Sequence, residues 1–187
     1  MQIRDRDELS HYVNYGNRVE YLFFWGHQKS GGGIMKSCFS QWYDAPFIEG
    51  GITYQTAEHY MMAAKARLFC DDDAVQRAVA ASSPGEAKKI GRKVKGFDEQ
   101  LWDRHRFEIV VKANLLKFDQ NLALKDFLVS TGNQVLVEAS PVDRIWGIGL
   151  AVDDPAAKNP NLWQGLNLLG FALMEVRNQF CSWESHA

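Results

Sequence analysis

A succession of helix-forming segments, several of them with start signals, is the feature that most constrains the fold of this chain. Ser83-Pro84-Gly85-Glu86 is a capping box with proline at the first helical position, which predicts that a helix begins there. Thr56 suits the N-cap of a strongly helix-forming segment, and Asp71 to Asp73 can cap the next one. Besides the helix that begins at the capping box, helices are predicted over residues 56–69, 73–81, 98–117, 121–130 and 163–181.

Short β-rich runs outside these helices predict a small sheet. Residues 19–25 and 135–139 are apolar and predict buried strands. Shorter strands are predicted over residues 38–43, 47–48 and 52–54. The sequence therefore predicts an α+β fold, a single mostly helical domain with a small β-sheet over residues 19–181, which follows a polar N-terminal segment over residues 1–18.

The composition excludes several classes of protein. A chain of 187 residues with 46% hydrophobic content is long enough to bury the core of one domain. The 11 Phe, 6 Tyr and 6 Trp residues exclude a disordered chain. No uncharged run reaches the ~20 residues that a membrane helix needs, and the charged first residues do not resemble a secretory signal. We therefore expect a cytoplasmic protein without a membrane partner, whose oligomeric state the sequence leaves open.

Charge and metal-ligand patterns narrow the possible partners and cofactors. The net charge is −2, and a pI of about 6.2 argues against an extended nucleic-acid groove. Cys38, Cys70 and Cys181 are scattered, which predicts buried thiols rather than disulfides or a zinc site. The histidines have no metal-ligand spacing either. We expect neither a metal nor a cofactor.

Glu58 and Lys65 form the first candidate catalytic pair, on the helix predicted over residues 56–69. They are seven residues apart, which places them within about 20° of the same helix face, with Met61 and Met62 between them. Partial desolvation shifts the pKa of an acid and of an amine toward neutrality. This would suit Glu58 for general acid–base catalysis and Lys65 for attack on a carbonyl carbon. A surface helix with ordinary solvated charges is the alternative.

A second candidate cluster follows the strand predicted over residues 135–139. Glu138 and Asp143 offer carboxylates that can bind ribose hydroxyls or the N–H groups of a base, and Trp146 offers a stacking face. Core aromatics and ordinary loop residues are the alternative explanation. Asn167, flanked by leucines in the last predicted helix, needs hydrogen-bond partners from the protein or from a ligand if it is buried.

An ordered set of motifs resembles the NADAR, or YbiA-like, N-glycosidase family. The likeness covers about residues 19–180. In order, the motifs are Phe39-Ser-Gln-Trp-Tyr43, Tyr54-Gln-Thr-Ala-Glu-His-Tyr60 followed by Ala64-Lys65, Ile90-Gly91-Arg92, Trp102, Lys117-Phe118-Asp119-Gln120-Asn121, Leu136-Val-Glu138, Asp143 through Gly147, and Asn167-Leu-Leu-Gly-Phe-Ala-Leu-Met-Glu-Val-Arg177. An ordered set of this length is far more specific than any one of its motifs.

The resemblance implies an enzyme that hydrolyses N-glycosidic bonds on ribose phosphates. The implied substrates are ribosylamino-pyrimidine phosphates, early intermediates of the riboflavin pathway, with ribose 5-phosphate as a product. The alternatives are removal of ADP-ribose from guanine in DNA, as in antitoxins of the family, and a module that binds NAD or ADP-ribose without catalysis. The partner is then a small ribose phosphate or an ADP-ribosylated nucleic acid. Departures at Gly31 to Gly33 and around Lys65 affect substrate choice more than reaction type.

The resemblance also implies roles for individual residues. Glu58 and Trp102 match active-site positions, and Lys65 matches a lysine proposed to form a Schiff base with the opened sugar. The residues that match pocket positions are Glu138, Asp143, Trp146 and Asn167. A carboxylate can protonate the leaving nitrogen and activate water, whereas an amine can trap C1′ covalently.

Arg92 and Arg106 are the candidate phosphate ligands of the sequence. A guanidinium group fits phosphate oxygens because its N–H donors are arranged as a planar fork. Ordinary surface charge is the alternative for both residues.

Overall fold

Two short parallel strands, brought together from distant parts of the sequence, lie at the centre of the fold. The computed structural model describes residues 3–28 and 33–184. Strand β1 (Tyr21–Phe24) pairs in parallel with β4 (Val135–Glu138), so that Phe24 is opposite Glu138. A separate antiparallel hairpin is formed by β2 (Phe47–Glu49) and β3 (Ile52–Tyr54). The prediction of an α+β fold with a small sheet is confirmed.

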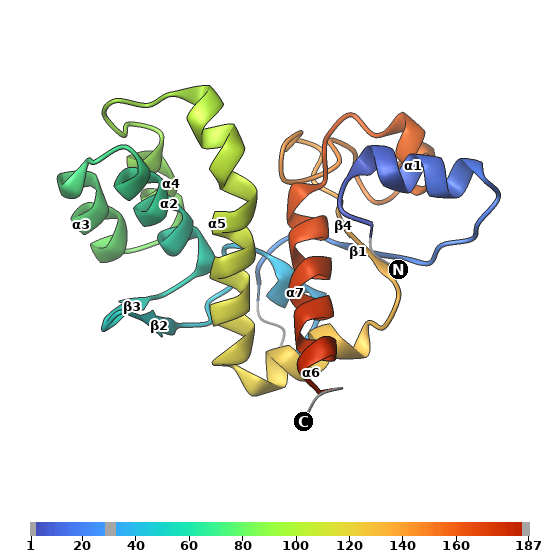
Figure 1. The fold of residues 1–187 in the computed structure, drawn as a ribbon, viewed down its shortest axis with the longest axis horizontal. Helices are drawn as coiled ribbons and strands as arrows, with labels where there is room; N and C mark the ends of the chain where they lie inside the picture. The colour runs from blue at the N-terminus through green and yellow to red at the C-terminus, as the bar shows by residue number, and fades with distance from the viewer. Residues whose placement is uncertain (1–2, 29–32, 185–187) are drawn as a thin grey trace.

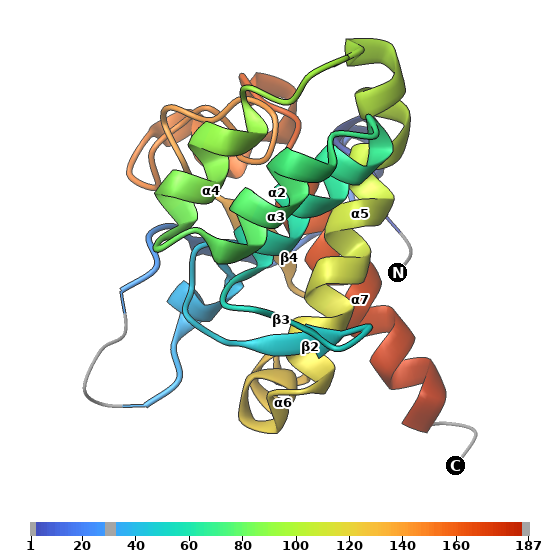
Figure 2. The same ribbon diagram turned by 90° about the vertical axis from the view of Figure 1, so that its left-hand side faces the viewer.

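Helices surround the central strands and determine the shape of the molecule (Figure 1). They are α1 (Arg6–Asn14), α2 (Ala57–Leu68), α3 (Asp72–Ala80), α4 (Pro84–Gly91), α5 (Glu99–Asp119), α6 (Leu122–Ser130) and α7 (Leu168–Glu184), with 3₁₀ helices η1 (Lys36–Phe39), η2 (Pro155–Lys158) and η3 (Pro160–Leu162). Helices α5 and α7 lie side by side, and α7 also packs on β4. Figure 2 shows α2, α3 and α4 grouped above the β2–β3 hairpin.

The capping signals place the helix starts where the sequence predicts them. The Thr56 hydroxyl accepts a hydrogen bond from the backbone N–H of His59, and the Ser83 hydroxyl accepts one from that of Glu86. The Glu86 carboxylate in turn accepts from Ser82, one residue before the expected partner, at 2.7 Å from both its backbone nitrogen and its hydroxyl. The helices predicted from residue 56 to residue 130 are confirmed, with ends that differ by one or two residues.

Two predicted elements are wrong in part. The segment over residues 38–43 is a 3₁₀ turn and an irregular stretch instead of a strand. The last helix begins at Leu168 rather than residue 163, because backbone N–H groups of the preceding segment bond to carbonyls of residues 144–148. Asn167 therefore precedes α7 instead of lying on it, and has a φ of 55°. Positive φ is tolerated better by asparagine than by most residues.

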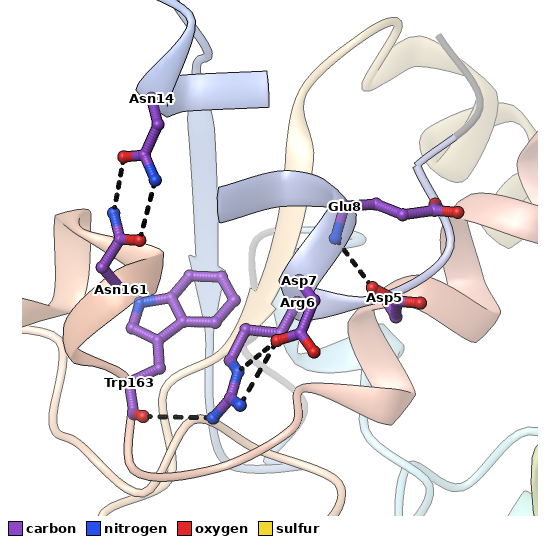
Figure 3. A network of polar contacts seen from close by, with 7 residues as sticks. All are labelled: Asp5, Arg6, Asp7, Glu8, Asn14, Asn161 and Trp163. Carbon is purple, nitrogen blue, oxygen red and sulfur yellow. Dashed lines mark hydrogen bonds and ion pairs between the residues drawn. The ribbon is translucent and has the colours of Figure 1, made fainter. Parts of the chain in front are cut away.

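Helix α1 lies in the N-terminal segment that the sequence shows only as polar. Its N-cap Asp5 accepts a hydrogen bond from the Glu8 backbone at 2.8 Å, and its Leu9 side chain is fully buried. Figure 3 shows how the helix is joined to the η3 region: Asn14 and Asn161 exchange two amide hydrogen bonds, and Arg6 donates to the Trp163 carbonyl. The buried Leu9 side chain and these distant polar contacts help to hold α1 in place.

The core is apolar, with β4 at its centre. Val135, Leu136 and Val137 have no exposed surface, and they pack among residues of α5 and α7 that include Phe118 and Phe171. In the described part of the chain, none of the helices has both the length and the apolar character to span a membrane.

The cysteines differ in exposure. Cys38 is buried, whereas Cys70 and Cys181 are exposed. The prediction of buried thiols is therefore correct only for Cys38.

Candidate active site

A cavity of about 890 Å³ lies beside the carboxyl end of β4, between α4 and the loop that follows the strand. It is lined by Trp25, Gly26, His27, Ser40, Trp42, Lys88, Arg92, Glu138, Ser140, Val142, Asp143, Arg144, Ile145 and Trp146. Four of the residues predicted from the sequence, Arg92, Glu138, Asp143 and Trp146, are among them. Aromatic rings, carboxylates and basic groups thus share one concave surface, which is the usual form of a small-molecule site.

Glu58 is buried close to this cavity, in the first turn of α2. Only 2% of its surface is exposed, and its backbone N–H donates to the Gln41 carbonyl at 3.0 Å. Burial raises the pKa of its carboxyl to about 7. The positive charge of Lys88 and a hydrogen bond from the Trp42 side chain act in the opposite direction. Such a carboxyl exchanges a proton near neutral pH, which general acid–base catalysis requires.

Glu138 is the last residue of β4 and lines the cavity. The pKa of its carboxyl is raised to about 8, mainly by burial and in addition by the negative charges of Asp143 and Glu58, while Lys88 acts in the opposite direction. Among the residues that the structure describes, Oε1 of Glu58 and Oε2 of Glu138 are buried without a hydrogen-bond partner. Buried carboxylate oxygens rarely stay unpartnered. Both are therefore suited to a ligand.

Asp143 is held in a tight turn after β4. Its Oδ1 accepts hydrogen bonds from the backbone N–H groups of Ile145 at 2.9 Å and of Trp146 at 2.8 Å. Gly147 allows this turn to pack on the end of β4, because a Cβ atom there would lie 2.8 Å from the Glu138 carbonyl oxygen. The glycine thereby brings Asp143 and Trp146 next to Glu138.

Lys88 and Arg92 supply the positive charge of the cavity from α4. They are four residues apart and so share one face of the helix end. Gly91 sets how closely α4 approaches α2, since a Cβ atom at this position would collide with the Met62 side chain. Both basic residues lower the pKa of Glu58, although burial outweighs them.

Lys88 and Trp42 were not among the candidates from the sequence. A signal for Lys88 was present, because the capping box fixes the phase of α4 and so puts it on the face of Arg92. Trp42 lies within one of the family motifs, yet the place of its side chain depends on a segment without regular structure.

Lys65 and Trp102 form a separate pair. The Lys65 ammonium lies 4.1 Å from the centre of the Phe97 ring and 5.3 Å from that of Trp102. Burial lowers the pKa of Lys65. Neither Lys65 nor Trp102 is among the described residues that line the cavity. The structure thus brings these two predicted residues together, apart from the carboxylate group.

Arg106 and Asn167 have partners within the protein. Arg106 is half-buried and forms an ion pair with Asp103 at 2.7 Å. Asn167 is fully buried behind the cavity, where its Oδ1 accepts from the Glu138 backbone and its Nδ2 donates to the Leu136 carbonyl. Asn167 therefore positions Glu138 through the backbone.

The donor set of the site is acidic and basic rather than metal-binding. Within the described residues, no group of three His, Cys, Asp or Glu side chains is placed to hold a metal ion. The carboxylates of Glu58 and Glu138 interact instead with Lys88. This arrangement can move protons and bind an anionic group.

Comparison with known proteins gives the family of this fold and site. The model of the NADAR domain matches residues 23–181. The chain belongs to the NADAR domain family. The resemblance seen in the sequence motifs is confirmed, and the match contains every residue of the cavity.

Relatives support the same assignment over most of the chain. The N-glycosidase R617 of Acanthamoeba polyphaga mimivirus is 42% identical over 165 residues, which cover 86% of this chain and 96% of that protein. The N-glycosidase YbiA of Escherichia coli is 32% identical over 143 residues, which cover 76% of this chain and 79% of YbiA. The NMR structure of E. coli YbiA matches with a TM-score of 0.70 at 26% identity, over 91% of this chain and 90% of that chain.

A plant relative is much longer than this chain. The riboflavin biosynthesis protein PYRR of Zea mays, described as chloroplastic, is 37% identical over 135 residues, which cover 68% of this chain but only 20% of PYRR. At the level of the NADAR family, the expected class of enzyme is confirmed. The relatives named N-glycosidase are hydrolases that act on N-glycosyl bonds.

Proposed function

We propose that this NADAR-family chain hydrolyses the C1′–N bond of ribosylamino-pyrimidine phosphates, early intermediates of the riboflavin pathway, and releases ribose 5-phosphate. The observation that carries the proposal is the meeting of two buried carboxyls, Glu58 and Glu138, with the basic groups of Lys88 and Arg92 at one cavity. The maize relative named for riboflavin biosynthesis supports the choice of substrate.

The two carboxyls suit the proton transfers of this reaction. A leaving nitrogen must gain a proton as the C1′–N bond breaks, and water must lose one as it adds to C1′. Burial raises the pKa of Glu58 to about 7 and that of Glu138 to about 8, so protonated and ionised forms coexist near neutral pH. In our proposal Glu58 is the principal proton-transfer group. The carboxylate of Asp143 favours the positive charge that develops on the sugar.

The other groups of the cavity suit the ends of the substrate. Arg92 and Lys88 provide donors for the ribose phosphate, since charge-assisted hydrogen bonds to phosphate are strong. The Trp42 and Trp146 rings offer stacking faces for a flat pyrimidine. Stacking, phosphate binding and proton transfer therefore have separate residues in or directly beside one cavity.

Release of ribose 5-phosphate from a ribosylamino-pyrimidine phosphate is the measurement that tests this proposal. We expect turnover by the wild type, a loss of about 10²–10⁴-fold in kcat for Glu58→Gln, and a much smaller change in KM. Glu49→Gln is the matched control, because Glu49 is paired with Lys112 outside the cavity. It should retain wild-type kinetics.

Two results would overturn the proposal in favour of the alternatives. Binding without release under single-turnover conditions would identify a module that binds a nucleotide without catalysis. Turnover of an oligonucleotide carrying ADP-ribosyl guanine, with the pyrimidine phosphate inert, would identify the ADP-ribosyl hydrolase.

A further inference from the structure

The segment over residues 38–42, which comprises the end of η1 and the irregular stretch after it, carries groups of the active site without being part of a sheet. Ser40 and Trp42 line the cavity, and Cys38 and Gln41 are buried. Backbone polar groups of a buried segment need partners, and strand pairing does not supply them here. Two of its carbonyl groups, and the side chain of Gln41, have partners on α5 instead.

Lys117 of α5 is the first of these partners. Its side chain has no exposed surface, and its Nζ donates to the Cys38 carbonyl at 2.6 Å and to the Ser40 carbonyl at 2.9 Å. In the described part of the chain, no carboxylate forms an ion pair with it. An ammonium group buried on neutral acceptors is costly, and burial accordingly lowers the pKa of Lys117 to about 8.

Asn114, one turn earlier on α5, is the second partner. It is also fully buried, and its Nδ2 donates to the Gln41 side-chain oxygen at 2.8 Å and to the Val110 carbonyl at 2.9 Å. Two neighbouring residues of one helix thus hold residues 38, 40 and 41. We call Lys117 and Asn114 the α5 anchor.

The segment held by the α5 anchor in turn holds Glu58. The Gln41 carbonyl accepts from the Glu58 backbone N–H at 3.0 Å. The Ser40 hydroxyl accepts from the Trp42 backbone N–H at 3.1 Å, and the Trp42 side chain lies close enough to the Glu58 carboxylate to lower its pKa as a hydrogen-bond donor. Contacts through Gln41 therefore connect α5 with the backbone of Glu58, and contacts through Ser40 and Trp42 connect it with the Glu58 carboxylate.

We propose that Lys117 and Asn114 are positioning residues for the active site, which hold residues 38–42 so that the Gln41 carbonyl binds the Glu58 backbone and the Trp42 ring stays beside the Glu58 carboxylate. This explains why a charged amine is retained in the core, where it contributes neither an ion pair to the described residues nor contact with the cavity. The effect on catalysis rests on the proposed function, in which Glu58 transfers the proton.

The effect on Glu58 itself can be measured without any substrate. We suggest NMR titration of the Glu58 carboxyl carbon, assigned with Glu58→Gln, in the wild type, Lys117→Met and Trp42→Phe. The Trp42 hydrogen bond favours the ionised carboxylate, so its loss should raise the pKa of Glu58 by about half a unit or more in both variants. The double variant should show no further increase, because both changes remove the same hydrogen bond.

The other charges that face Glu58 stay in place in Lys117→Met. They are Lys88 and Arg92 on α4, Glu138 at the end of β4 and Asp143 in the loop after it. Lys112→Met is the matched control, since Lys112 is on the same helix but more than half exposed and paired with Glu49. It should leave the pKa of Glu58 unchanged.

Kinetics give the second readout. On a substrate that the wild type turns over, Lys117→Met should lower kcat about tenfold or more with KM within about threefold, which is the pattern of a lost transition-state contact. Asn114→Ala, which removes the Gln41 contact but leaves both Lys117 contacts in place, should show a smaller change in the same direction. It also serves as the second variant if Lys117→Met does not fold.

These outcomes distinguish a failure of the α5-anchor proposal from a failure of the proposed function. A folded Lys117→Met or Asn114→Ala protein with the wild-type pKa at Glu58 would overturn the anchor. A wild type that releases no ribose 5-phosphate would overturn the proposed function, and an active Glu58→Gln enzyme would overturn the proton-transfer role of Glu58. In either case the titration would still decide whether Lys117 positions Trp42.

Discussion

The Asn167 side chain fixes the backbone of Glu138 from the side opposite the cavity. Its Oδ1 accepts from the Glu138 N–H at 3.0 Å, and its Nδ2 donates to the Leu136 carbonyl at 2.9 Å. Gly170 allows this close approach, because a Cβ atom there would collide with the Leu136 carbonyl. The amide thus takes the place of a further strand beside β4, at the residue whose carboxyl enters the cavity.

Asn167→Ala should therefore destabilise the protein strongly. It leaves a buried N–H and a buried carbonyl without a partner, at about 1–3 kcal/mol each, so we expect a loss of about 2–5 kcal/mol in the free energy of unfolding. Urea unfolding followed by circular dichroism measures it. Asn161→Ala is the control. Asn161 makes only exposed hydrogen bonds, so this substitution should lower the free energy of unfolding by at most about 1 kcal/mol. Equal losses in the two variants would contradict the role of Asn167.

The buried carboxyl of Glu58 should make stability depend on pH in an unusual direction. Its pKa is about 7 in the folded protein and near 4.5 when exposed, so between these values the folded state holds a proton that the unfolded state releases. The stabilising proton is fully present below pH 4.5, and its contribution is lost as the pH rises through 7. The difference between the folded and unfolded pKa values corresponds to about 3 kcal/mol in the free energy of unfolding.

Glu58→Gln should accordingly be more stable than the wild type at pH 8, by up to about 3 kcal/mol, and nearly equal to it at pH 5. Urea unfolding at pH 5, 6, 7 and 8 measures the two slopes. Glu108→Gln, on the exposed surface of α5, should follow the wild-type slope. A Glu58→Gln protein that loses stability at pH 8 would show that burial does not disfavour the charged carboxylate.

Local signals predicted the helices that form the walls of the site. Thr56 and Ser83 cap α2 and α4 as expected, because a capping hydrogen bond joins residues only three apart. The position of Glu58 in the first turn of α2 follows from the first of these caps. The cap at Ser83 fixes the phase of α4, which places Lys88 and Arg92 on the same face of that helix.

Contacts between distant residues produced the features that the sequence did not predict. Residues 38–43 look like a strand, but their backbone bonds to Lys117, nearly 80 positions later. The start of α7 is delayed by loop carbonyls about 20 residues earlier in the chain. Local patterns contain no information on such partners, so the role of Asn167 behind Glu138 could be seen only in the structure.

The two arginines proposed as phosphate ligands should now differ in function. Arg92 lines the cavity, whereas Arg106 is paired with Asp103. Arg92→Met should raise KM for the ribosylamino-pyrimidine phosphate about tenfold or more, with little change in kcat, because a charge-assisted hydrogen bond is lost. Arg106→Met should change KM less than about twofold. Steady-state kinetics would contradict this assignment if Arg106→Met had the larger effect.

Lys65 provides a test for a covalent route. Burial against the Phe97 and Trp102 rings lowers its pKa, and a neutral amine is the form that attacks a carbonyl carbon. If Lys65 traps C1′ of the opened sugar, borohydride should reduce the imine to a stable adduct on Lys65, which mass spectrometry of peptides would locate. Lys65→Arg should give no adduct, because guanidinium remains protonated.

The same experiment decides between two amines and water. An adduct on Lys88, the lysine that lines the cavity, would move the nucleophile to α4. The absence of any adduct during turnover would leave water as the nucleophile, activated by proton transfer to a carboxyl. Of these results we expect no adduct, because Lys65 and Trp102 lie outside the cavity beside the carboxyls, and water activated by a carboxyl is the nucleophile of the proposed reaction.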